Sequence, residues 1–300
     1  MPFGFLLEQL LNGLIISAIY ALIAVGLSLI FGVLKLVNFS HGEIYMLGGY
    51  TYYFLIKLLH FPPLLGLLST VVLLFLVGAV IERTLLRLPS NISVDRKDEY
   101  TILITFGLSI FIQNLALALF GPWNRSPGSI LPGRIAFGQL VIAGDRVIAL
   151  GMGLLIVFAM VLFLGRTYFG WAIRSVSQDP DASAIVGIEP KRINLLTFGL
   201  GSALAGVAGA LVGPIFLIHP SMGTLPSVKA FVIIVLGGMG SVKGSILGAL
   251  ILGEVESLGG VFFPDPTRAM AYKDAYGLLI LILVLVFRPS GLFGEKGRKG

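Results

Sequence analysis

A polar stretch of the chain, residues 170–188, reads GWAIRSVSQDPDASAIVGI and separates two long apolar segments. It carries the signals that begin and end a short helix. Asp179 can cap a helix whose first residue is Pro180, where the missing N–H costs nothing. Gly187 can close that helix in the left-handed conformation. So short a helix is unstable alone in water, so something must hold it. The pattern therefore predicts a helix outside the bilayer that docks a soluble partner.

The composition is that of an integral membrane protein. Of 300 residues, 56% are hydrophobic and 12% are charged, with a mean hydropathy of +0.97, whereas a soluble domain carries roughly 25% charged residues. The net charge of +6 is therefore interpreted as a determinant of membrane topology, and no nucleic-acid partner is expected. The absence of cysteine excludes disulfides and thiolate metal sites. No basic region precedes the first apolar run and no small-residue cleavage site follows it, so we expect a retained span and not a signal peptide.

We expect an all-α, polytopic fold of eight or nine membrane segments, because helices satisfy their own backbone groups in lipid. Two regions are irregular and are expected to be broken or re-entrant. Residues 39–59 carry His41, Glu43 and Lys57, and residues 228–263 are interrupted by a glycine-rich turn at 237–244. The clear spans, each near the 20 residues or so that a crossing needs, are 10–34, 62–81, 101–120, 147–164, 193–218 and 276–287, the last with a possible extension over 269–275.

The basic residues give the orientation. With the N-terminus outside and nine alternating segments, 14 of the 21 Lys and Arg residues fall inside and 7 outside. The positive-inside rule favours this arrangement, which puts the 179–187 helix and the C-terminus in the cytoplasm. An even number of segments would require the N-terminus inside.

Residues 44–50 (IYMLGGY) are similar to residues 233–239 (IIVLGGM). Transporters often have duplicated halves, but chance suffices for such a match between apolar stretches.

Residues 38–43, NFSHGE, open the first irregular segment and allow two interpretations. His41 and Glu43 can line a translocation pathway at the start of a half-helix. Alternatively, this is a polar helix start at the membrane face, with Ser40 or Asn38 as the cap and Glu43 stabilised by the helix dipole. Two such residues offer too few ligands for a metal site, so no metal or cofactor is expected.

Four polar residues inside other spans are further pathway candidates. Glu254 and Glu256 are costly in lipid and should face the bundle interior or water. They are two residues apart, so they cannot share one helix face. We expect one to face the pathway while the other lies near the aqueous end of the span. For Gln113 and Asn114, hydrogen bonding between helices is favoured over contact with a solute.

Residues 238–245, GMGSVKGS, resemble a phosphate-binding loop only superficially. Val242 and Gly244 flank Lys243, where such a loop requires glycine before the lysine and serine or threonine after it. We therefore expect no ATP site and no enzymatic activity in this chain. The small residues at 199–213 predict close packing of one span against its neighbours.

Further stretches carry a family resemblance. Residues 12–14 (NGL), 19–32 (IYALIAVGLSLIFG) and 37–50 (VNFSHGEIYMLGGY) resemble the opening of the bacterial branched-chain amino-acid ABC transporter permeases, more closely the "H" permease subunit than its "M" partner. Residues 174–188, 236–241 and 287–294 are also similar to the family pattern, so the resemblance covers about 12–294.

The resemblance implies one transmembrane permease domain over 1–300, with a cytoplasmic loop at 165–192 that couples it to an ATPase. It implies a multi-pass protein of the bacterial inner membrane with three kinds of partner: a second homologous permease, two cytoplasmic ABC ATPases and an extracytoplasmic substrate-binding protein. The residues expected to couple the chain to the ATPase are Arg174, Asp179, Pro180, Asp181, Ala182, Ala184 and Gly187.

The expected function is passage of branched-chain amino acids through a pathway that partner ATPases power. The alternatives are an ABC permease for urea or another small polar solute, and an ion-coupled secondary transporter with Glu43 or Glu254 as the ion site. An aqueous channel is a third. The capped cytoplasmic helix counts against the last two. Because the spans offer almost no buried basic group for a carboxylate, we expect a pathway of apolar and small side chains at the interface with a second permease, with selectivity set by the binding protein.

Overall fold

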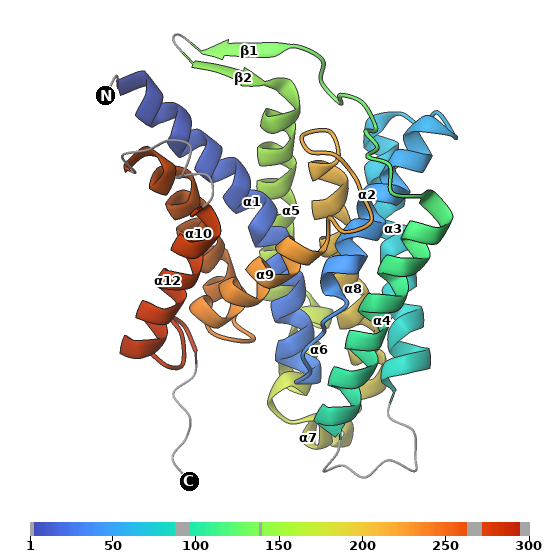
Figure 1. The fold of residues 1–300 in the computed structure, drawn as a ribbon. Coiled ribbons are helices and arrows are strands. Elements are labelled where there is room, and N and C mark those ends of the chain that lie inside the picture. The colour runs from blue at the N-terminus through green and yellow to red at the C-terminus, as the bar shows by residue number, and fades with distance from the viewer. Residues whose placement is uncertain (1–2, 88–96, 138–139, 263–271, 295–300) are drawn as a thin grey trace.

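The computed structural model describes residues 3–87, 97–137, 140–262 and 272–294, which form a bundle of helices with one small hairpin (Figure 1). The elements, in chain order, are α1 (Phe3–Leu34), α2 (His41–Lys57), α3 (Pro63–Ile81), the π-helical turn η1 (Glu82–Leu86), α4 (Lys97–Phe120), β1 (Arg134–Phe137), β2 (Leu140–Ala143), α5 (Gly144–Arg166), α6 (Tyr168–Gln178), α7 (Pro180–Ile185), α8 (Pro190–Val212), α9 (Thr224–Gly237), α10 (Val242–Phe262) and α12 (Lys273–Phe287).

The polytopic helical fold is confirmed, but the count of eight or nine spans is not. Within the described residues, α1, α3 with η1, α4, α5 and α8 are long and apolar enough to cross a membrane. The pair α9 and α10, bent by 117° at the predicted glycine-rich break, adds at most one more. The 17 residues of α2 and 14 of α9 reach only about 26 and 21 Å at 1.5 Å per residue, less than the ~30 Å hydrocarbon core.

Two local features differ from the expected segments. The span predicted over 193–218 ends as a helix at Val212, because Pro214 has no N–H with which to continue the helical hydrogen bonds. Residues 213–223 instead form an irregular loop. The antiparallel hairpin of β1 and β2, paired from Arg134 with Ala143 to Phe137 with Leu140, was not predicted at all. The proposed extension over 269–275 lies partly outside the described residues, and α12 begins at Lys273.

The helices α1 and α8 form the centre of the bundle. In their most apolar stretches 78% and 83% of the residues are buried, against 17% in α4, which is therefore peripheral. Small residues let the central helices approach closely, as predicted for 199–213. A Cβ placed on Gly201 of α8 would lie 2.7 Å from the Gly26 carbonyl oxygen of α1, and one on Gly209 only 1.9 Å from the Tyr45 carbonyl oxygen of α2.

Two helix triplets, α1–α2–α3 and α8–α9–α10, have related arrangements. In each, a long buried helix is followed by a short helix, and the first helix of each triplet packs against the third of the other. The starts of the two short helices meet, since a Cβ on Gly42 would lie 2.2 Å from the Gly223 carbonyl oxygen. The echoing residues 44–50 and 233–239 fall on α2 and at the end of α9, the two equivalent short helices.

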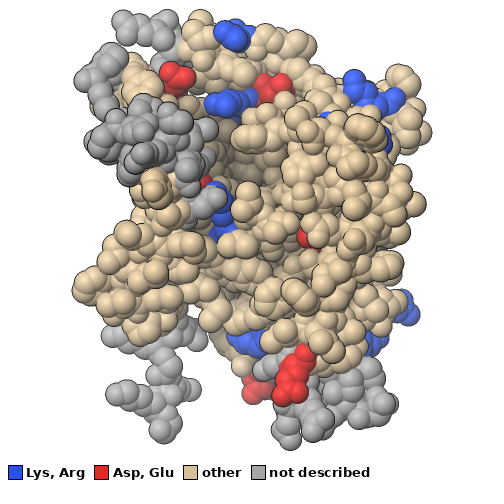
Figure 2. All heavy atoms as spheres, in the orientation of Figure 1, with Lys and Arg blue, Asp and Glu red and all other residues tan. Residues whose placement is uncertain are grey.

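The two ends of the bundle differ in structure. The start of α1 and the hairpin lie at one end, and α6 and α7 at the other (Figure 1). On the face shown in Figure 2, charged side chains gather mainly towards these two ends and in a hollow, and the broad surface between them is nearly free of charge. This is the distribution expected of a protein whose middle lies in lipid.

Candidate functional site

The helix predicted in the polar stretch is present as α7, and its capping is confirmed. The Asp179 carboxylate accepts the backbone N–H groups of Asp181 and Ala182, both at 2.9 Å, and Pro180 occupies the first helical position. Gly187 has φ +86°, the left-handed conformation predicted for the closing residue. Its N–H donates to the Ala184 carbonyl, which completes the helix end.

The neighbouring helices hold α7 in place. The hydroxyls of Ser175 on α6 and Ser183 on α7 are 2.8 Å apart, and Ser183 is buried. Arg174 donates to the Leu164 carbonyl at the end of α5, so it fastens α6 to the bundle. The apolar end of α7 has no such contact, because Ile185 is 87% and Val186 72% exposed. The other predicted coupling residues, Pro180, Asp181, Ala182 and Ala184, are exposed beside them.

The predicted pathway residues His41 and Glu43 lie at the start of α2, where both are buried. His41 Nε2 donates to the Ile23 carbonyl oxygen at 3.0 Å, which ties α2 to α1. The Ser109 hydroxyl of α4 donates to Glu43 Oε1 at 3.3 Å. The two side chains therefore contact different helices.

The prediction that a side chain caps the start of α2 is wrong. Ser40 occupies the capping position, but its side chain accepts no N–H of the helix, because its φ of −81° and ψ of 3° are not the extended geometry of a cap. Instead, its hydroxyl donates to Asn38 Oδ1 at 2.7 Å. The Glu43 and Ile44 N–H groups donate to the Ser40 carbonyl.

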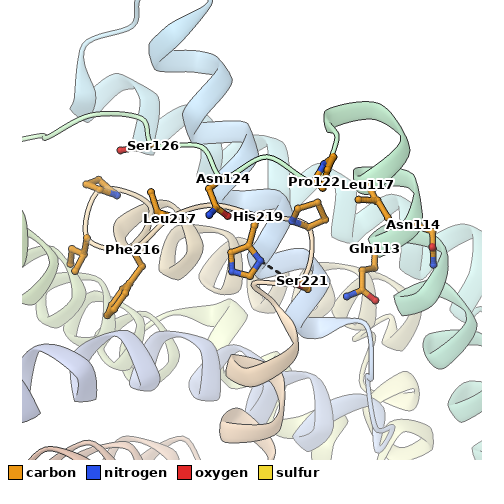
Figure 3. A pocket seen from close by; sticks show the side chains of 13 residues that line it. Gln113, Asn114, Leu117, Pro122, Asn124, Ser126, Phe216, Leu217, His219 and Ser221 are labelled. Atoms are coloured by element: carbon orange, nitrogen blue, oxygen red, sulfur yellow. Dashed lines mark hydrogen bonds between the residues drawn. The ribbon is translucent and has the colours of Figure 1, made fainter. Parts of the chain in front are cut away.

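Gln113 and Asn114 of α4 line an open cavity of about 820 Å³ with residues of the loops that follow α4 and α8 (Figure 3). We call it the outer cavity. Among its lining residues, His219 Nδ1 lies 3.1 Å from the Ser221 hydroxyl. The predicted hydrogen bond from Asn114 to another helix is not formed. Its amide instead donates to the Ile110 carbonyl of its own helix at 2.8 Å. Both amides are therefore placed where a solute could contact them.

The loop that borders the outer cavity, residues 213–223, is held by the loop that follows α4. The backbone groups of Arg125 and Ile218 exchange hydrogen bonds of 2.9 and 2.8 Å. The Arg125 guanidinium lies 5.4 Å from the centre of the Tyr53 ring on α2, a cation–π contact. Loop 213–223 is thus fixed against α2 through Arg125.

Glu254 and Glu256 of α10 point to different partners, as their spacing predicts. The Glu254 carboxylate lies against α1, where a Cβ on Gly13 would be 2.5 Å from its Oε2. The Glu256 side chain is 1% exposed and forms a salt bridge of 2.8 Å with Lys229 of α9. The Tyr20 hydroxyl of α1 donates to the same carboxylate at 2.9 Å.

Lys229 and Tyr20 were not predicted as site residues. Lys229 is a single half-buried basic group, so the expectation of almost no buried basic group in the spans holds with this one exception. The Lys229 side chain is only 15% exposed. A charged lysine inside an apolar run such as 225–237 is costly in a membrane, and such residues usually have a partner and a function. Its position in this run could therefore have identified Lys229 as a site residue from the sequence. Its partner, 27 residues away on another helix, is visible only in the fold.

Comparison with known proteins agrees with this architecture. A family model described as "Branched-chain amino acid transport system / permease component" matches residues 9–287. A solved chain of PsaBC from Streptococcus pneumoniae, in complex with Fab, has a similar fold, with a TM-score of 0.50 at 16% identity over 97% of this chain and 94% of that one.

Two relatives match over nearly their whole length. The high-affinity branched-chain amino acid transport system permease protein BraD of Pseudomonas aeruginosa is 35% identical, over 96% of both proteins. The corresponding protein LivH of Salmonella typhimurium is 31% identical, over 98% of this chain and 97% of LivH. The chain is thus a multi-pass helical membrane protein that belongs to the family of branched-chain amino acid transport system permeases and resembles their "H" subunit.

Proposed function

We propose that this chain is the membrane subunit of an ABC importer and provides the translocation pathway for branched-chain amino acids, with ATP hydrolysed by separate subunits. The observation that carries the proposal, in a chain of this family, is α7. This capped helix lies at the opposite end of the bundle from the hairpin and exposes Ile185 and Val186. An ion-coupled secondary transporter would have no use for such a docking helix.

The proposed assembly has partners at both ends and within the membrane. Residues 165–192 form the coupling loop of a single permease domain and dock a cytoplasmic ATPase. The outer cavity receives the solute from an extracytoplasmic binding protein, because it opens among loops at the end of α8 away from α7. A second, homologous permease completes the pathway in the bacterial inner membrane, and a second ATPase docks on that subunit.

Reconstitution of the whole assembly tests this function. Proteoliposomes with the two permeases, the ATPases, internal ATP and the external binding protein should accumulate leucine, isoleucine and valine, and should not accumulate urea. The chain purified alone should hydrolyse no ATP. Accumulation of urea in place of the amino acids, or uptake by the chain alone driven by an ion gradient, would refute the proposal.

A second prediction concerns two acids inside the bundle, the buried Glu43 and the half-buried Glu254. Replacing each with glutamine should lower uptake roughly two- to tenfold. The change removes a negative charge at both positions, and at Glu43 it also weakens the hydrogen bond from Ser109, worth about 0.5–1.5 kcal/mol. The order of preference among solutes should not change, since Glu43 contacts Ser109 and Glu254 lies against Gly13, away from the outer cavity. Competition for leucine uptake measures the preference. Glu8→Gln, at an exposed acid of α1, is the matched control, and a changed preference in either test variant would contradict the prediction.

A further inference from the structure

A second cavity, of about 290 Å³, lies between α1, the end of α8 and α9. We call it the inner cavity. Its walls are mostly aliphatic, from Ile16, Ile19 and Ile23 of α1, Val212 of α8, and Met222 and Leu225 near the start of α9. The volume is close to the lower bound of about 300 Å³ for small-molecule sites, which suits a solute of amino-acid size.

The inner cavity adjoins the outer cavity. Four residues of one loop, Phe216, Leu217, His219 and Ser221, line both cavities. Loop 213–223, which Arg125 fixes against α2, therefore borders both cavities.

An ion pair borders the inner cavity at its far side. Lys229 Nζ lies 2.8 Å from both carboxylate oxygens of Glu256, and it also lies 5.3 Å from the centre of the Tyr20 ring. Lys229 and Tyr20 line the inner cavity. Lys229 and Glu256 also line a third cavity, of about 230 Å³, whose other walls are apolar, such as Val228, Leu252 and Leu278. Lys229 therefore lines two largely apolar cavities, and its partner Glu256 lines one of them.

A purely structural function accounts poorly for this pair. Removing two charges from water costs several kcal/mol for each ion, so a well-packed apolar pair generally holds two helices at least as well. The central helices already pack closely through glycine, as at Gly201 and Gly209. Charges retained inside a membrane protein mark a solute or ion pathway by default. Here both signs of charge line the third cavity among apolar side chains, and Lys229 also faces the aliphatic wall of the inner cavity.

We infer that Lys229 and Glu256 form a recognition site for the zwitterionic head group of an aliphatic amino acid. The ammonium of Lys229 binds the solute carboxylate, and the Glu256 carboxylate binds the solute ammonium. Each protein charge exchanges its partner for the solute, so neither is left uncompensated inside the bundle. The aliphatic wall of the inner cavity packs against the solute side chain. The inference rests on the proposed function and adds a selectivity step in the permease itself.

The double variant Lys229→Met with Glu256→Gln tests the inference in the complete assembly. It removes both charges of the pair together, so neither Lys229 nor Glu256 leaves the other as a buried unpaired ion. Leucine should raise the Tm of the wild-type assembly without binding protein, and it should not raise the Tm of the variant. Uptake by the variant should fall about tenfold or more, since each lost hydrogen bond to a charged group is worth at least one factor of ten. Lys57→Met, at an exposed lysine of α2, is the matched control and should leave both measurements unchanged.

A second measurement uses the wild-type assembly alone and decides the matter even if the double variant does not fold. Leucinamide lacks the carboxylate and 4-methylpentanoate lacks the ammonium, so neither should raise the Tm as leucine does. The inference is overturned if either analogue stabilises as much as leucine, if leucine does not stabilise a wild type that transports it, or if a folded double variant transports normally. A wild type that transports no branched-chain amino acid would overturn the proposed function instead.

Discussion

Replacing Ile185 with aspartate is expected to remove the ATPase subunits from the purified assembly and to lower ATP-driven uptake by about a hundredfold or more. Ile185 is the last residue of α7 and is 87% exposed, so the change costs the fold little. In the proposed complex the same side chain is buried against the ATPase. An uncompensated charge in such an interface costs about 3–5 kcal/mol, which corresponds to more than a hundredfold in binding. Copurification on a tagged permease and uptake in proteoliposomes measure the two effects.

Val141→Asp is the matched control for copurification. Val141 lies on β2 at the opposite end of the bundle and is 52% exposed, so it receives the same change in a comparable setting. It should retain the ATPases. Normal copurification of the ATPases with the Ile185 variant would show that α7 is not their docking helix.

Replacing Gly48 with alanine should lower the thermal midpoint of the purified protein, although alanine favours helices. A Cβ on Gly48 of α2 would lie 2.0 Å from the carbonyl oxygen and 2.4 Å from the Cα of Gly206 on α8. Both contacts are backbone atoms, so no side chain can rotate away and the two helices must separate. Overpacking of this kind costs about 1–3 kcal/mol and sometimes more.

The same substitution at Gly107 is the control, and it should not lower the thermal midpoint. A Cβ on Gly107 of α4 meets nothing within 4 Å. It should leave the midpoint unchanged or raise it, since alanine is favoured over glycine inside a helix by about 1 kcal/mol. Equal shifts in the two variants would mean that α2 and α8 do not pack as closely as described.

The sequence predicted best what depends on neighbours along the chain. The ends of α7 follow from Asp179, Pro180 and Gly187 alone, because capping groups act within a few residues. The break between α9 and α10 follows from a run of glycines in the same way. The prediction that Ser40 caps α2 is an exception. Its residue type suits a cap, but its backbone angles do not, and the sequence does not reveal those angles.

Contacts between distant segments could not be predicted in this way. The pairing of Lys229 with Glu256 and Tyr20 needs three helices to be placed correctly, and no local pattern encodes it. The predicted number of spans was not confirmed, for a related reason. Hydropathy measures whether a segment is apolar, but α2 and α9 are short helices whose starts meet inside the bundle, which composition does not reveal.

The end of α9 depends on a part of the chain made much later. The Leu236 and Gly237 carbonyls at the break accept the N–H groups of Leu292 and Phe293, each at 2.9 Å. Backbone carbonyls without partners are expensive in lipid. A ribosome that has just completed α9 must add more than fifty further residues before these donors exist. The bend between α9 and α10 can therefore reach its final hydrogen bonding only near the end of translation, whatever the order in which the other helices enter the membrane.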